Sequence, residues 1–225
     1  MTNFLAIDAS TYVGSVAILT DSGALVAEAE AAMRGAEEER LMPAVAALVE
    51  RSGISPSDLA GVICGAGPGS FTSLRIAASI AKGMASGLGI PLFAVSSLLL
   101  IPAGVSPAPA PGHYLALLDA MRGDFHALRC TVSARGQIDA VGEVTLCSSD
   151  DLSGTASGSQ DEPVEIGPGR AIDAFPRARG VARLMARILA GGPVDIGNWE
   201  PLYGRLAEAE VRLRAATSNS ALQQS

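Results

Sequence analysis

The first hundred residues alternate short apolar segments with two segments of helical length. Runs of apolar residues, or an alternation of apolar and polar residues, indicate strands, whereas apolar residues that recur every three or four positions indicate helices. The expected elements are strands at residues 4–8, 15–19 and 25–30, a helix at 37–51, a strand at 61–64, a helix at 70–87 and a strand at 92–95. Three antiparallel strands followed by alternating helices and strands predict a mixed α/β sheet.

A second unit follows a proline-rich stretch. Residues 101–112, IPAGVSPAPAPG, are expected to form a linker. The next segment, YLALLDAMRGDFHALRC, can be laid over FLAIDASTYVGSVAILT near the N-terminus. Each has an apolar strand that ends in an aspartate, Asp119 or Asp8, then a turn with glycine and a second alternating strand. This weak internal repeat predicts two related lobes, at residues 1–100 and 101–225.

The second lobe is expected to be the smaller one, because residues 148–163 are rich in Ser, Gly and Asp and add little to a core. Its other expected elements are a strand at 164–166, a turn at 167–169, a helix near 179–189 and a last helix from Leu206. The last helix is expected to pack within this lobe or back on the first. Arginines between residues 170 and 187 recur at helical intervals, which favours a solvated helix face.

Composition indicates an ordinary globular protein, with 48% hydrophobic and 17% charged residues. The net charge of -7 argues against a nucleic-acid-binding surface, since Lys82 is the only lysine and the arginines are scattered. The N-terminus lacks a basic leader, and no apolar run reaches the roughly 18 residues of a membrane span, so we expect a cytoplasmic protein. Three widely spaced cysteines, Cys64, Cys130 and Cys147, are expected to be buried free thiols.

The segment GAGPGSFTSLRIAASIAK, residues 65–82, combines a strand end, a rigid turn and a helix of small residues. Glycines and a proline make the turn tight, and Ser70 is placed to cap the helix. The helix N-terminus is either a capped turn or a site for an anion or a partner's carboxylate. It is not a P-loop, because no lysine stands at the required spacing.

The same segment resembles the GPGSFTGLRIG signature of the bacterial TsaB family, formerly called YeaZ. All positions from Gly67 to Ile76 match except Ser73, and Ala77 replaces the final glycine. The two replacements affect close backbone contacts and not the fold. Two less specific segments, DAMRGDFHA at 119–127 and EPLYGR at 200–205, extend the resemblance to the second lobe.

The resemblance implies an α/β protein of two RNase H-like lobes, the second reduced, in the superfamily of actin, Hsp70 and sugar kinases. It further implies a non-catalytic accessory subunit that activates a TsaD-like enzyme during the formation of N6-threonylcarbamoyladenosine in tRNA. A TsaE-like ATPase is expected to join the assembly, with ATP or ADP and Mg near the subunit interface. No direct contact of this chain with tRNA is expected.

In the family, the two helices of the first lobe pack against the same helices of TsaD or of a second TsaB copy. The resemblance therefore implies a homodimer when the chain is alone, and an interface on the predicted helices. The expected interface residues are Leu41, Val45, Leu48, Ser70, Phe71, Thr72, Arg75, Ala78 and Met84.

Few residues are candidates for binding a metal or phosphate or for catalysis. Asp8 with Ser10 and Thr11, together with Asp119, is a candidate contact for Mg and phosphate, and the alternative is that Asp8 ends a strand and accepts hydrogen bonds in a turn. The acidic run at 37–39 is explained by the positive end of a helix dipole. The only histidines, at 113 and 126, form no metal-binding pair, which argues against a glycoprotease and against a catalytic triad.

Two other functions stay open. One is a small ATPase or phosphotransferase of the same superfamily that uses Asp8 and Asp119. The other is a structural homodimer with no part in tRNA modification.

Overall fold

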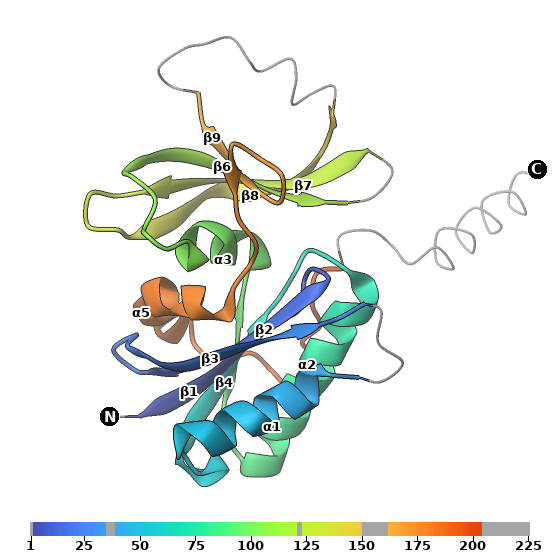
Figure 1. Ribbon diagram of the computed structural model, residues 1–225, viewed down its shortest axis with the longest axis vertical. Coiled ribbons are helices and arrows are strands. Elements are labelled where there is room, and N and C mark those ends of the chain that lie inside the picture. The colour runs from blue at the N-terminus through green and yellow to red at the C-terminus, as the bar shows by residue number, and fades with distance from the viewer. Residues whose placement is uncertain (1, 35–38, 121–122, 150–161, 204–225) are drawn as a thin grey trace, which may run out of the picture.

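The computed structural model of the 225-residue chain describes residues 2–34, 39–120, 123–149 and 162–203. Within these residues the chain forms two mixed sheets with helices around and between them (Figure 1). None of the described helices is both long and apolar enough to cross a membrane.

The first sheet has the strand order β3-β2-β1-β4-β5. Its strands are β1 (Asn3–Asp8), β2 (Val13–Thr20), β3 (Leu25–Ala32), β4 (Leu59–Gly65) and β5 (Leu92–Val95). β1 pairs antiparallel with β2 and parallel with β4, so it lies at the centre of the sheet. Its alternate residues belong to two hydrophobic cores, one on each face. The strands agree with those expected from the sequence to within two residues at each end.

The second sheet repeats this arrangement, with the order β10-β9-β6-β7-β8. Its strands are β6 (Gly112–Asp119), β7 (Asp124–Val132), β8 (Ile138–Ser148), β9 (Val164–Gly167) and β10 (Ile172–Asp173). In both sheets the first strand in sequence is flanked by the second, antiparallel, and by the fourth, parallel. Asp8 and Asp119 end these equivalent central strands. The expected α/β fold of two RNase H-like lobes is therefore confirmed.

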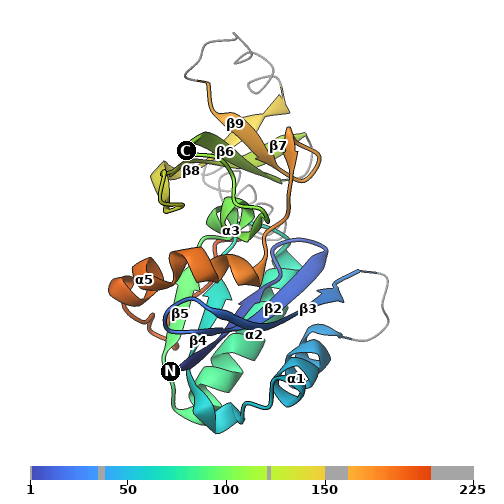
Figure 2. The ribbon, with the colours of Figure 1, turned by 60° about the vertical axis from the view of Figure 1, so that its left-hand side comes forward.

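Two helices, α1 (Leu41–Ser52) and α2 (Phe71–Leu88), lie side by side on one face of the first sheet (Figures 1 and 2). Their apolar stripes close a core with the strand residues that point to this face. α1 begins four residues later than expected, and Glu37 and Glu38 lie outside the described residues. The carboxylate of Glu39 accepts hydrogen bonds from the amides of Leu41 and Met42, so an acidic side chain caps this helix end.

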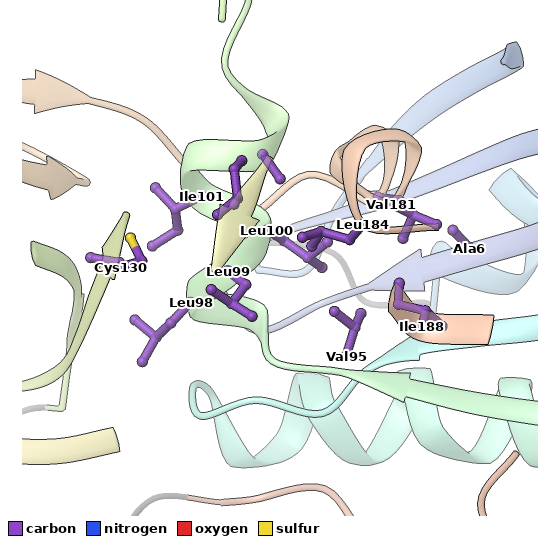
Figure 3. Close-up of a cluster of buried hydrophobic side chains, with 14 of the residues drawn as sticks. Ala6, Val95, Leu98, Leu99, Leu100, Ile101, Cys130, Val181, Leu184 and Ile188 are labelled. Carbon is purple, nitrogen blue, oxygen red and sulfur yellow. The ribbon is translucent and has the colours of Figure 1, made fainter. Parts of the chain in front are cut away.

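The opposite face of the first sheet is covered by α3 (Ser97–Gly104) and α5 (Val181–Gly191). α3 is buried along its whole length, because it lies between the two sheets. Figure 3 shows Leu98 and Ile101 on the side of Cys130 in the second sheet, and Leu100 on the side of Leu184 in α5. One hydrophobic core therefore runs from the first lobe through α3 into the second.

The prediction that residues 101–112 form a linker is wrong for the first four of them, because they lie in this core. Residues 101–104 form the last turn of a buried helix, and only 105–111 connect it to β6. The prolines suggested a solvated segment, but the run of apolar residues that precedes Pro102 is buried on all sides. The expected lobe boundary after residue 100 falls inside α3.

The prediction of a solvated helix face is wrong for Arg179 and Arg183, which join elements distant in sequence, whereas Arg187 is exposed on α5 as expected. The Arg183 guanidinium donates to the carbonyl oxygens of Ala103 at 2.8 Å and Val105 at 2.9 Å. Arg179 donates through Nε to the Gly104 oxygen at 2.8 Å. These bonds satisfy carbonyls at the C-terminal end of α3, which its own helix leaves unpaired.

After α5 the chain continues along the first lobe. The amide of Val194 donates to the Leu92 oxygen at 2.8 Å, and the amide of Leu202 donates to the Ala66 oxygen at 2.7 Å. We call residues 194–203 the C-terminal strap. The helix expected from Leu206 lies outside the described residues.

Candidate functional site

The turn at residues 65–70 is held against the end of β1 by close backbone contacts. A Cβ on Gly69 would lie 2.2 Å from the Ser10 carbonyl oxygen, and one on Gly65 would lie 1.9 Å from Oδ2 of Asp8. The Ser70 amide donates to the same Ser10 oxygen at 2.8 Å. Glycine is required at both positions because any side chain would push the two loops apart.

The side chain of Asp8 connects the two loops through hydrogen bonds. Its Oδ1 accepts hydrogen bonds from the Ser10 amide at 3.1 Å and the Ser10 hydroxyl at 2.8 Å, and its Oδ2 accepts from the Ser97 hydroxyl at 2.5 Å. Ser97 Oγ in turn accepts from the Gly67 amide at 3.0 Å. The side chain of Asp8 is 0% exposed, and this burial raises the pKa of its carboxyl above the ordinary value, although the hydrogen bonds oppose the shift.

The expected nucleotide contacts do not form a common exposed site in this arrangement. Both carboxylate oxygens of Asp8 are engaged inside the protein, Ser10 is buried, and the Thr11 hydroxyl donates to the Val13 carbonyl. Asp119 is exposed on the second lobe. These side chains do not fit a magnesium or phosphate ligand set, since the first two present no free oxygen to solvent. The geometry supports the alternative, in which Asp8 ends a strand and orders a turn.

Ser70 stands at the N-cap position of α2, as expected, but its side chain does not bond to a helix amide. Its hydroxyl lies 3.1 Å from that of Ser73. Ser73 and Ala77, which replace two glycines of the family signature, are both buried, and Ala77 lies in the core between the helices and the first sheet. The close contacts that these two replacements were expected to affect therefore lie inside this chain and not at its surface.

The residues expected at a partner interface divide into two groups. Leu41, Val45 and Leu48 are buried in the core between α1 and the first sheet, and Ala78 is buried on α2. This corrects the prediction for these four, because a side chain that packs on its own sheet is not available to another protein. The other members are exposed or half-buried: Ser70, Phe71, Thr72, Arg75 and Met84.

Two residues that the prediction did not select lie beside the exposed group. The Tyr203 ring packs against that of Phe71, with centroids 4.8 Å apart, and Leu202 is 53% exposed. The segment EPLYGR contains both, so sequence similarity marked the region without indicating its contact with α2. Ser97, which joins Asp8 to the turn, carried no signal, because nothing in its neighbourhood resembles a known motif.

In the described part of the chain, no three His, Cys, Asp or Glu side chains are placed to hold a metal ion. All three cysteines are free, as expected, but Cys147 is half-buried, whereas all three were expected to be buried. Burial raises the pKa of the Cys64 thiol, and it raises the pKa of Cys130 to about 11. The two buried thiols are therefore protonated at neutral pH and unreactive. Burial lowers the pKa of His126, which favours its neutral form.

Comparison with known proteins agrees with this fold. The solved structure of YeaZ from Pseudomonas aeruginosa superposes with a TM-score of 0.76 over 90% of this chain and 100% of that one, at 23% identity. The fold therefore defines a protein of the two-lobed RNase H-like class. A family model described as "TsaD: tRNA N6-adenosine threonylcarbamoyltransferase" matches residues 31–178.

Two curated relatives carry a more specific name than the family model does. The "tRNA threonylcarbamoyladenosine biosynthesis protein TsaB" of Escherichia coli K12 is 36% identical over 122 residues, which are 54% of this chain and 52% of that protein. The protein of the same name from Bacillus subtilis 168 is 39% identical over 94 residues, which are 42% of this chain and 41% of that one. The chain thus matches about half the length of these relatives or less. It belongs to the family that this TsaD model describes, and it is similar to these TsaB proteins.

Proposed function

We propose that this protein is a non-catalytic subunit that binds and activates a TsaD-like catalytic subunit in the formation of N6-threonylcarbamoyladenosine in tRNA. Its membership of the TsaD family and its similarity to two TsaB proteins support this pathway. The observation that carries the subunit role is the exposed face of α1 and α2, which consists largely of small, uncharged side chains.

On α1, the residues that point away from the sheet near its N-terminus are Met42, Pro43, Ala46 and Ala47. On α2, the small exposed residues at three- to seven-residue intervals are Thr72, Ser79, Gly83 and Ser86, and Arg75 is exposed between the first two. A Cβ on Gly83 would meet no atom within 4 Å, so the helix backbone itself is accessible there. Two neighbouring helices with such faces allow helices of a partner to approach closely, as in a helical bundle.

A non-catalytic role is supported by the buried Asp8. Its oxygens serve the turn at 65–70, so the catalytic groups and any metal belong to the partner in this proposal. The proposal places ATP or ADP with Mg near the subunit interface and adds a TsaE-like ATPase to the assembly. The net charge of -7 supports tRNA binding by the partner and not by this chain. The same burial argues against an ATPase that acts through Asp8.

Co-expression with the cognate TsaD-like subunit tests the proposal. The wild-type chains should co-purify, and tRNA modification should fall when this chain is omitted. Gly83→Glu should abolish the complex while this chain keeps its fold, because the new side chain enters open space on the binding face. Gly191→Glu is a matched control, since Gly191 ends α5 and a Cβ added there would also meet no atom within 4 Å. Absence of co-purification, together with undiminished modification, would refute the proposal.

The same face also fits a second copy of this chain, because small side chains on both copies would allow the helices to approach closely. We therefore propose that the isolated protein forms a homodimer through α1 and α2, which the catalytic subunit displaces. Analytical ultracentrifugation of wild type and Gly83→Glu should show a dimer and a monomer, respectively. If Gly83→Glu abolishes self-association and tRNA modification is unaffected, the protein is a structural homodimer and not a subunit of the modifying enzyme.

A further inference from the structure

An exposed cluster at the N-terminal end of α2 combines side chains from two distant segments. Phe71 and Arg75 come from the first turns of the helix, and Leu202 and Tyr203 come from the C-terminal strap. Leu202 is 53% exposed and Phe71 is 39% exposed. We call these four residues the strap patch.

The strap patch is held by backbone contacts and not by its side chains alone. The Leu202 amide donates to the Ala66 oxygen at 2.7 Å, and a Cβ on Gly67 would lie 2.4 Å from the Leu202 oxygen. Within the strap, three residues before Leu202, the Trp199 ring lies with its centre 5.8 Å from the Lys82 ammonium. Because the backbone is already ordered, a partner that binds here pays little of the usual entropic cost of fixing a surface.

Arg75 gives the strap patch a charge that none of the described residues neutralises. No carboxylate among them lies within ion-pair distance of its guanidinium, which sits 5.3 Å from the centre of the Phe71 ring. Arg170, Arg177, Arg179 and Arg187, by contrast, all pair with an acidic side chain. A guanidinium held in this way beside exposed aromatic and aliphatic side chains is complementary to a carboxylate that has an apolar neighbour.

The strap patch adjoins the face already proposed to bind the catalytic subunit. Thr72 lies between Phe71 and Arg75 in sequence and begins the exposed row that continues through Ser79 to Gly83. We propose that the strap patch is the charged end of this interface, and that it recognises a carboxylate beside an apolar side chain on the catalytic subunit. This inference rests on the proposed function, and it makes the C-terminal strap part of the recognition surface.

The test is the affinity of the full-length chain for the catalytic subunit, measured by titration calorimetry at low and high salt. Arg75→Glu and Leu202→Asp should each weaken binding at least tenfold, and Arg75→Glu should also reduce the salt dependence of the affinity. Arg129→Glu and Val164→Asp are matched controls, because both side chains are exposed on the second sheet, and they should change the affinity less than twofold. Thermal melts verify that all four variants are folded.

The results separate this inference from the proposed function. If Gly83→Glu abolishes binding but both strap patch variants bind like wild type, the helical face is the interface and the strap patch is not part of it. If Leu202→Asp alters only self-association, or only lowers the melting temperature of the isolated chain, the patch serves a second copy or the chain's own remaining residues, and the inference is overturned. If the wild-type chain does not bind the catalytic subunit at all, the proposed function itself fails.

Discussion

The link between Asp8 and the turn at 65–70 predicts opposite outcomes for the same substitution at two adjacent serines. The Ser97 hydroxyl donates to Asp8 Oδ2 at 2.5 Å and accepts from the Gly67 amide at 3.0 Å, and Ser97 is fully buried. The Ser96 hydroxyl is also buried, but it has no hydrogen-bond partner in the described part of the chain. Ser97→Ala therefore removes two bonds, whereas Ser96→Ala removes none.

The magnitude follows from what each change leaves behind. In Ser97→Ala the Gly67 amide is left buried and unpaired, which costs about 1–3 kcal/mol, and the carboxylate loses a bond worth about 1.5–3 kcal/mol. The free energy of unfolding should fall by about 3–5 kcal/mol, a large part of the roughly 5–15 kcal/mol typical of a domain. Ser96→Ala should be neutral within about 0.5 kcal/mol or slightly stabilising, because an unsatisfied polar atom is replaced by hydrogen.

Urea unfolding followed by circular dichroism measures both changes, with the slope of the transition as a check that the two-state assumption holds. The Ser97→Ala variant should also expose the turn at 65–70 to faster amide hydrogen exchange, and Ser96→Ala should not. Equal destabilisation of the two variants, or a loss below about 1 kcal/mol for Ser97→Ala, would refute the argument that Asp8 positions the turn through this hydroxyl.

Three further predictions use the same logic. Gly65→Ala should strongly destabilise the protein in thermal melts, because its Cβ would overlap a buried carboxylate oxygen. Gly83→Ala should stabilise the protein by up to about 1 kcal/mol, because alanine favours a helix more than glycine does. The reverse order of the two variants would contradict the packing described. Arg183→Met should cost about 1–3 kcal/mol by urea unfolding through the lost bonds to the C-terminal end of α3, whereas Arg187→Met, which breaks an exposed pair, should cost less than about 1 kcal/mol. The pKa of the Asp8 carboxyl is raised by burial, so its contribution to stability is fully present below the ordinary value of 3.8 and is lost as pH rises through the raised value. The stability of wild type relative to Asp8→Asn should therefore decline from acid to neutral pH, and a flat difference would show that the carboxyl does not titrate as described.

Much of the fold could be predicted from the sequence, because its signals are local. Strands of the first lobe alternate or form short apolar runs, and the helix from Phe71 follows a turn of glycines and proline. The repeat around Asp8 and Asp119 indicated two related sheets, and the common strand order confirms it. Such periodicities survive in a linear sequence because each depends on residues a few positions apart.

The prediction failed where a residue's environment comes from a distant segment. Residues 101–104 were expected to belong to a proline-rich linker, yet both sheets pack around them. The apolar stripe of α1 was assigned to a partner, although Val45 is buried on the chain's own sheet. Amphipathic patterns show that a face is covered, but they do not show by what.

The sequence by itself determined the family signature, the two-lobed plan and the small-residue character of α2. Only the tertiary structure shows that both carboxylate oxygens of Asp8 accept hydrogen bonds, from Ser10 and Ser97. It also shows that α3 joins the two lobes in one core, and that the C-terminal strap lies beside Phe71. The physical reason is that burial and hydrogen-bond partners are properties of chain segments brought together from far apart, whereas backbone preferences and periodicity are carried by neighbouring residues.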